Sequence, residues 1–113
     1  MVEPLHEQRC APFPEGTPAL SSEAIEAMLE TLDAWRHDEA ASEIRKSFSF
    51  SDYHHTMAFV NAVAWIAHVE DHHPDMAVGY NRCTVRFSTH SIGGVSQNDL
   101  ICAAKIDRLG SAG

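Results

Sequence analysis

Histidine is the side chain of this sequence with the clearest potential for chemistry, because imidazole exchanges protons near neutral pH. Eight histidines occur among 113 residues, and two of them, His72 and His73, are adjacent and directly precede Pro74. A third, His90, follows a segment with strand periodicity. A helix end and a strand end can meet at the rim of a sheet, where loops shape pockets. Three imidazoles placed there could supply both an acid and a base near pH 7.

Structural interpretations of the same residues stay open. Histidines at the C-terminal end of a helix favour the helix macrodipole, so His72 and His73 could be structural. Asp99 follows Ser96 in the Ser-x-x-Asp form of a capping box, and its carboxylate is predicted to cap the start of a helix. The same carboxylate could also orient a histidine, and the two roles are compatible.

A metal site is a further interpretation. His68 and His72 are four positions apart, a spacing that would place them on one helix face and can bind a divalent metal. The string His68-Val-Glu-Asp-His72 has no identified third ligand and lacks the H-E-x-x-H arrangement of zinc proteases. We therefore expect no metal at this position.

The elements that must position these residues follow from periodicity. Apolar residues at helical spacing predict a helix capped by Ser21 or Ser22, and a longer one over about 52–70 that Pro74 prevents from continuing. Alternation predicts strands at 35–38, 43–50, 76–81 and 83–89, with Lys46 an exception on the apolar side of its strand. A third helix is predicted to start at Ser96. The buried stripe predicted for the long helix comprises Tyr53, Met57, Val60, Val63, Ala64 and Ala67.

This element order, α-β-β-α-β-β-α with short links between successive strands, predicts an α+β fold. An antiparallel sheet should carry the three helices on one face. Residues 1–20, here called the leader, contain four of the five prolines and no hydrophobic periodicity, so an irregular conformation is predicted. Residues 21–113 are predicted to form a single domain, because a chain of 113 residues is too short for two cores.

The composition excludes several classes of function. A formal net charge of −8, from 16 acidic and 8 basic residues, disfavours binding to nucleic acid. The sequence shows no apolar run of membrane-spanning length and no signal-peptide pattern at its start, so a cytoplasmic protein without membrane contact is expected. Cys10, Cys83 and Cys102 are widely spaced and odd in number, which predicts neither a zinc site nor a disulfide framework. Cys83 and Cys102 are expected to be small core residues.

Taken together, the spaced polar residues resemble the signature of the pterin-4a-carbinolamine dehydratase family. That signature is a histidine pair before proline, a tyrosine, a third histidine and an aspartate, found here as His72, His73, Pro74, Tyr80, His90 and Asp99. The segments Phe59-Val-Asn-Ala-Val63 and Ser88 to Asp99 are similar as well, so the resemblance spans about 21–107. It implies a four-stranded antiparallel sheet with three helices, assembled as a homodimer or homotetramer.

The resemblance also implies an activity, the removal of water from a 4a-hydroxytetrahydropterin to give a quinonoid dihydropterin during aromatic amino acid hydroxylation. His72 and His90 would act as acid and base, and His73 would hold the pterin. The residues implied to bind substrate or to support the histidines are Asp71, Pro74, Tyr80 and Asp99. No cofactor is implied, because the pterin is the substrate. The leader with Cys10 resembles bacterial members that accompany phenylalanine hydroxylase, which is a candidate partner.

The sequence departs from the family pattern in two places. His68 stands where an acidic residue is usual, and Asp75-Met76-Ala77 replaces bulky aromatic residues after the proline. The first departure alters the charge near His72, and the second alters a pocket wall. Two other functions stay open: a protein-binding module without turnover, docking on a hydroxylase or a regulator, and a histidine-rich metal-binding protein.

Overall fold

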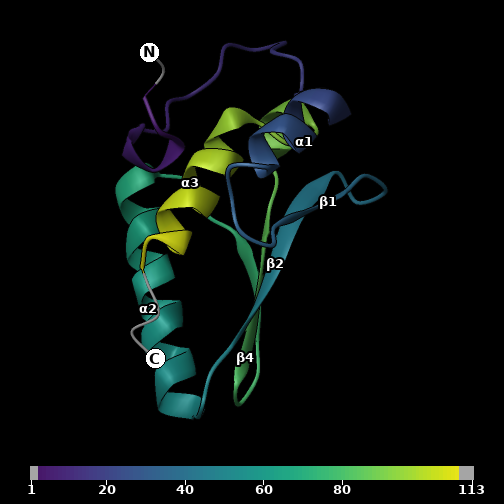
Figure 1. Ribbon diagram of the computed structural model, residues 1–113. Helices are drawn as coiled ribbons and strands as arrows, with labels where there is room; N and C mark the ends of the chain where they lie inside the picture. Colours follow the sequence, from purple (N-terminus) through teal and green to yellow (C-terminus); the bar gives the residue numbers. More distant parts are fainter. Residues whose placement is uncertain (1–2, 110–113) are drawn as a thin grey trace.

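The computed structural model describes residues 3–109 and contains the expected elements in the expected order (Figure 1). The helices and strands are α1 (Ser22–Leu29), β1 (Arg36–Asp38), β2 (Glu43–Ser49), α2 (Tyr53–Glu70), β3 (Asp75–Val78), β4 (Arg82–Phe87) and α3 (Gln97–Asp107), with two 3-10 turns, η1 (Leu5–Glu7) and η2 (His90–Ile92). The four strands pair antiparallel in the order β1-β2-β4-β3. The predicted α+β fold is confirmed. Residues 110–113 of the predicted domain lie outside the described residues.

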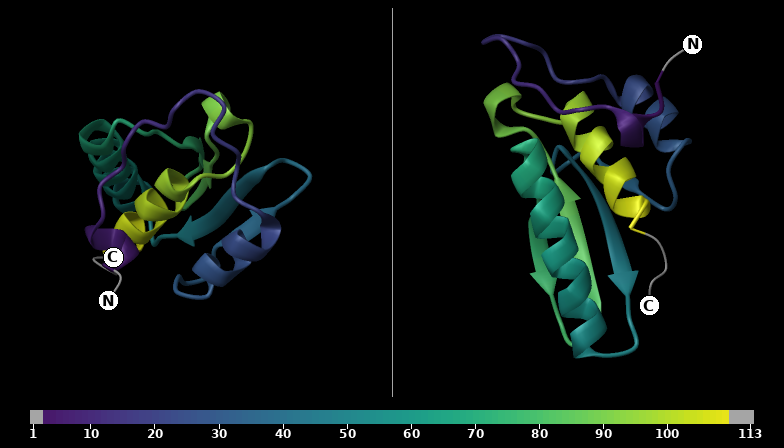
Figure 2. Two further views of the ribbon diagram at one scale, coloured as in Figure 1. Left: turned by 90° about the horizontal axis from the view of Figure 1, so that it is seen from above. Right: turned by 90° about the vertical axis from the view of Figure 1, so that its left-hand side faces the viewer.

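One face of the sheet is covered by helices. Ile44 of β2 lies opposite Phe87 of β4 in the register, and both side chains are buried. Their neighbours alternate to the other face, where Arg45 and Ser47 are exposed, because successive side chains of a strand point to opposite sides. Figure 2 shows α2 and α3 beside each other across the covered face, and Ile25 of α1 joins the same core.

Lys46 occupies a core-facing position of β2, and its charge is matched there by a carboxylate. Its Nζ donates a hydrogen bond of 2.9 Å to Oδ1 of Asp107, at the end of α3. The same oxygen accepts a bond of 3.0 Å from the indole N–H of Trp35. The side chains of Lys46 and Asp107 are only 12% and 16% exposed, so either charge would be costly without the other. The exception in the strand pattern is therefore an ion pair that joins α3 to the sheet.

The longest described helix, α2, buries a face that differs from the predicted stripe. Tyr53 is 48% exposed and Ala64 is also exposed, so the prediction is wrong at both positions. Val63 is buried as predicted, and Thr56 is buried although it is polar. The Thr56 hydroxyl lies 2.9 Å from two carbonyls, that of Asp52 one turn earlier and that of Tyr80, and either can accept its proton, so the buried hydroxyl is satisfied. Within residues 3–109, no helix is both long and apolar enough to cross a membrane.

The leader is held against α2 and α3 by hydrogen bonds. The N–H of Cys10 donates to Oε1 of Glu70 at 2.8 Å, and the N–H of Ala11 donates to Oδ1 of Asn98 at 3.3 Å. The side-chain amide of Asn98 donates in return to the Ala11 carbonyl at 2.9 Å. Glu70 is buried and also binds Nε of Arg9 at 2.9 Å. These bonds place the segment around Cys10 at the C-terminal end of α2.

Candidate active site

The end of α2 determines the direction of His72. The helix ends at Glu70, and Asp71 adopts the left-handed conformation with φ 53° and ψ 44°. The N–H of His72 donates to the carbonyl of Ala67 and the N–H of Asp71 donates to that of His68, which are the two bonds of a Schellman motif. The chain therefore leaves the helix axis before His72. The prediction that His68 and His72 share one helix face is wrong, because residues i and i+4 share a face only inside a helix and His72 lies beyond its end.

Asp99 lies at the start of α3 with no exposed surface. Its Oδ2 accepts the N–H of Ser96 at 2.9 Å, and the predicted capping box is confirmed. The same oxygen accepts the hydroxyl of Thr89, also at 2.9 Å. A buried carboxylate is tolerated when hydrogen-bond donors surround it, and these two donors also fix its orientation.

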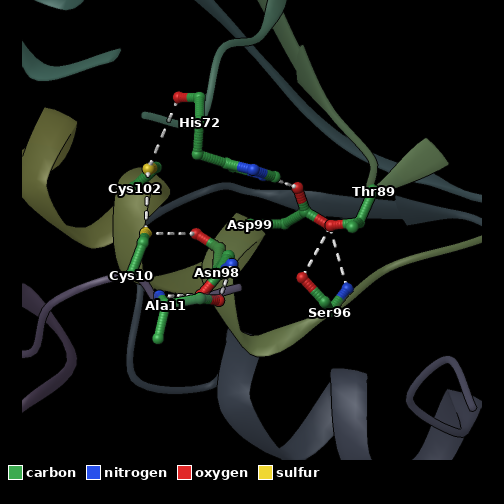
Figure 3. Close-up of polar contacts among 8 residues, drawn as sticks. All are labelled: Cys10, Ala11, His72, Thr89, Ser96, Asn98, Asp99 and Cys102. Atoms are coloured by element: carbon green, nitrogen blue, oxygen red, sulfur yellow. Dashed lines mark hydrogen bonds and ion pairs between the residues drawn. The ribbon is translucent and has the colours of Figure 1, made fainter. Parts of the chain in front are cut away.

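The other oxygen of this carboxylate faces the imidazole of His72, so Asp99 both caps α3 and orients a histidine. Oδ1 of Asp99 is 2.5 Å from Nε2 of His72 (Figure 3). The His72 side chain is 13% exposed, and its ring stacks on Phe87 with centroids 5.9 Å apart and an interplanar angle of 7°. The carboxylate accepts the proton on Nε2, so it selects one tautomer of the ring and fixes the direction of the ring. A histidine held in this way is suited to acid–base catalysis.

A pocket of about 570 Å³ opens beside His72. Residues 10–13 of the leader contribute to one side, and the lining also includes Asp71 and His72 after α2 and Thr89 and Ser91 after β4. Small-molecule sites typically have volumes of roughly 300–1,000 Å³. The lining combines imidazole, hydroxyl and carboxyl groups with a proline and a phenylalanine from the leader. It therefore offers both hydrogen-bonding groups and apolar surface to a small ligand.

The other two histidines of the signature lie outside the set of residues that line this pocket. His90 is exposed in η2, between Thr89 and Ser91, which both belong to the lining. His73 is exposed, and Pro74 after it is half-buried. The structure thus brings His72 to Asp99, whereas His73 and His90 lie at the surface, each next in sequence to a residue that lines the pocket. Catalytic roles for His73 and His90 stay a prediction.

Tyr80 lies away from His72. Its side chain is 65% exposed, and its carbonyl is bound by Thr56 near the N-terminal end of α2. From Thr56 to Glu70 the helix extends over roughly 20 Å, at 1.5 Å per residue. In this chain, therefore, the structure does not bring Tyr80 to the pocket beside His72.

The metal-binding interpretation receives no support from the described residues. Within residues 3–109, no group of three or more His, Cys, Asp or Glu side chains has an arrangement that could hold a metal ion. The exposed ring of His68 packs on Trp65, with centroids 5.4 Å apart, whereas the ring of His72 faces Asp99. The two histidines thus have separate surroundings.

Sequence reasoning missed the leader as part of the pocket. An irregular segment has no periodicity that reveals which surface it covers. One signal was available in Glu70, because an acidic residue in the last turn of a helix opposes the macrodipole and requires a partner. That partner is the leader, through the side chain of Arg9 and the N–H of Cys10.

Comparison with known proteins identifies the family of this chain. The family model described as pterin 4 alpha carbinolamine dehydratase matches residues 18–109. A protein of Nitrosospira multiformis is 54% identical over 96% of this chain and 94% of its own length, and one of Nitrosomonas eutropha is 53% identical over 93% and 92%. Both are provisionally named pterin-4-alpha-carbinolamine dehydratase. The crystal structure of a transcriptional coactivator/pterin dehydratase from Brucella melitensis has a TM-score of 0.77 and 32% identity, covering 80% of this chain and 97% of that one. The chain belongs to the pterin-4a-carbinolamine dehydratase family.

Proposed function

We propose that this protein catalyses the dehydration of 4a-hydroxytetrahydrobiopterin to the quinonoid dihydropterin by proton transfer to and from histidines. The observation that carries the proposal is the pairing of His72 with the buried carboxylate of Asp99 at the edge of a pocket of about 570 Å³. Membership of the family supports the reaction class, carbinolamine dehydration.

The reaction requires two proton transfers. The hydroxyl group on C4a leaves as water once its oxygen receives a proton, and a ring nitrogen loses a proton as the quinonoid system forms. An acid and a base that work near neutral pH each contribute roughly 10²–10⁴-fold. We assign these transfers to His72 and His90, with His73 holding the pterin. Asp99 is a positioning residue that acts through His72. The pterin is the substrate, and the step as written uses no cofactor.

His90 lies between two residues of the pocket lining. It is exposed, and the residues on either side of it, Thr89 and Ser91, line the pocket. Exposed side chains change rotamer within picoseconds to nanoseconds, so the imidazole of His90 is free to reorient when a ligand binds. This mobility supports His90 as the second proton-transfer group beside the constrained ring of His72.

The proposal extends to the setting of the reaction. The product is the oxidised pterin that a reductase returns to the tetrahydro form, so the activity would recycle the cofactor of aromatic amino acid hydroxylation in the cytoplasm. A phenylalanine hydroxylase is the proposed partner. We also propose a homodimer or homotetramer, because a domain of this size gains stability by burying further surface. Light scattering on the purified protein measures the assembly, and a monomer at all concentrations would contradict it.

A dehydration assay in the presence of EDTA tests the activity. Wild-type protein should accelerate carbinolamine decay over the spontaneous reaction, and His72→Ala should lose at least about tenfold of that acceleration. His68→Ala is the matched control, since His68 is an exposed histidine of α2 that packs on Trp65. It should retain the wild-type rate. Decay at the spontaneous rate with folded wild-type protein would refute the proposed function.

A second candidate function, protein binding without turnover, draws on an exposed apolar patch. Trp65 and Val69 on α2 are 65% and 43% exposed and, with Ile66 and Leu109, contribute to a groove of about 340 Å³. Exposed apolar patches of this kind mark interaction surfaces. The Brucella melitensis relative is described as both a coactivator and a dehydratase. Absence of turnover in the assay above would favour this candidate. A wild-type dehydration rate in Trp65→Ser would show that the patch is not needed for catalysis.

A further inference from the structure

Cys10 and Cys102 come together although neither was expected to have a sulfur partner. Their Sγ atoms are 3.6 Å apart (Figure 3). Cys10 belongs to the leader, is partly exposed and lines the pocket beside His72, whereas Cys102 is fully buried in α3. We propose that the two thiols form a reversible intramolecular disulfide on reaction with a hydroperoxide, and that this bond locks the leader onto α3 at the edge of the pocket.

The geometry allows the bond with a small movement. The sulfur atoms of a disulfide are about 2.05 Å apart, so the two Sγ atoms must approach by about 1.5 Å. Cys10 lies in irregular chain, where a shift breaks no helical hydrogen bond. Asn98 lies one turn before Cys102 on the same helix face. Its side-chain amide binds both the backbone N–H and the backbone carbonyl of Ala11. These two bonds keep the leader in register with α3 while the sulfurs close.

The two thiols differ in their exposure, which sets the order of the chemistry. The contact with Cys10, together with burial, raises the pKa of Cys102 well above its ordinary value, so Cys102 stays a neutral thiol. A peroxide in solvent therefore meets Cys10 first. Hydrogen peroxide transfers one oxygen atom to Cys10, which becomes a sulfenic acid, and releases one water.

The second step closes the bond. The sulfur of Cys102 attacks the sulfur of Cys10, the S–O bond of the sulfenic acid breaks, and the departing hydroxide takes the proton of Cys102 and leaves as water. Two thiols and one hydrogen peroxide thus give one disulfide and two waters. The thiols are oxidised and the peroxide is reduced. Exchange with an external dithiol reverses the bond.

The position of the pair connects the bond to the pocket. The thiol of Cys102 contacts the carbonyl of His72 at 3.9 Å, and the N–H of Cys10 is bound by Glu70 at the end of α2. The disulfide would therefore join the leader side of the pocket to the helix that contacts the backbone of His72. Cys83 is buried in β4 and provides an internal control.

Counting of thiols tests the bond. Full-length protein is treated with hydrogen peroxide, then denatured in the presence of N-ethylmaleimide, which alkylates the free thiols, and analysed by mass spectrometry. Wild type should fall from three free thiols to one, yield a peptide that links Cys10 to Cys102, and regain three thiols in dithiothreitol. Cys83→Ser should still form the link, and Cys10→Ser should keep both of its thiols. Three thiols after treatment, covalent dimers, or a sulfinic acid on Cys10 with Cys102 free would overturn the proposal.

Hydrogen exchange tests the locking of the leader. The amides of Cys10 and Ala11 are bound to Glu70 and Asn98, so their exchange reports opening of this segment. They should exchange several-fold more slowly in the oxidised protein than in the reduced protein. Peroxide-treated Cys102→Ser should show no such slowing. Equal exchange in the oxidised and reduced wild type would show that the bond does not hold the leader.

Discussion

The substitution Asp99→Asn separates the two functions of the Asp99 carboxylate. The amide retains an oxygen that can accept the N–H of Ser96 and the hydroxyl of Thr89, so α3 stays capped. The amide nitrogen then takes the position of Oδ1 and donates to Nε2 of His72, where the carboxylate oxygen lay before. The neutral imidazole must then carry its proton on Nδ1, and a protonated ring would no longer face a carboxylate.

The expected loss of activity follows from that contact. A hydrogen bond to a charged group contributes about 1.5–3 kcal/mol, which corresponds to a fall of roughly 10- to 150-fold in the dehydration rate. The fall should appear in kcat more than in KM, because Asp99 has no exposed surface and acts through His72. Asp99→Ala should in addition lose the helix cap, at a cost of about 0.5–2 kcal/mol in the free energy of unfolding.

Three measurements decide the outcome: dehydration kinetics, the melting midpoint, and the ¹⁵N shifts of the His72 ring, which identify the protonated nitrogen. Asp52→Asn is the matched control, because it makes the same change at the N-cap of α2, outside the residues that line the pocket. It should leave kcat close to wild type. Wild-type kcat in Asp99→Asn, with the ring proton on Nδ1, would refute the reasoning.

Three other positions provide local tests. His90→Ala should reduce dehydration by at least about tenfold without lowering the melting midpoint, and wild-type turnover would exclude a catalytic role. Asp52 caps the start of α2, where its carboxylate accepts the backbone N–H of His55, and this bond lowers the pKa of Asp52. The cap therefore stabilises the fold above pH 3.8, and the stabilisation is lost as the pH falls through the lowered pKa. The difference in melting midpoint between wild type and Asp52→Ala should therefore shrink below that pH, and a constant difference would contradict the assignment. Gly94→Ala would place a Cβ 2.9 Å from that of Ala19 and should lower the free energy of unfolding by about 1–3 kcal/mol. An unchanged free energy of unfolding would show that the leader around Ala19 can move away at no cost.

Local sequence patterns were sufficient to predict the order of the elements and to identify the residues capable of acid–base chemistry. Strand alternation at Ile44 and Phe87 and the capping box of Ser96 and Asp99 are local patterns, and each reflects backbone geometry within a few residues. Such patterns depend on neighbouring residues, so they can be recognised in the sequence. They also placed a histidine pair after a helix, although they could not show that Asp71 turns the chain at that point.

Which of these residues come into contact depends on the packing of distant segments. His72 and Asp99 are separated by 27 positions, and Cys10 and Cys102 by 92, so no periodicity relates the members of either pair. The contact of Thr56 with the carbonyl of Tyr80, 24 positions away at the turn before β4, is of the same kind. Contacts between distant segments depend on how the helices and the irregular leader pack on the sheet. Packing of that kind is set by the whole set of side chains that fill the core, and it leaves no local signature at the residues that it brings together.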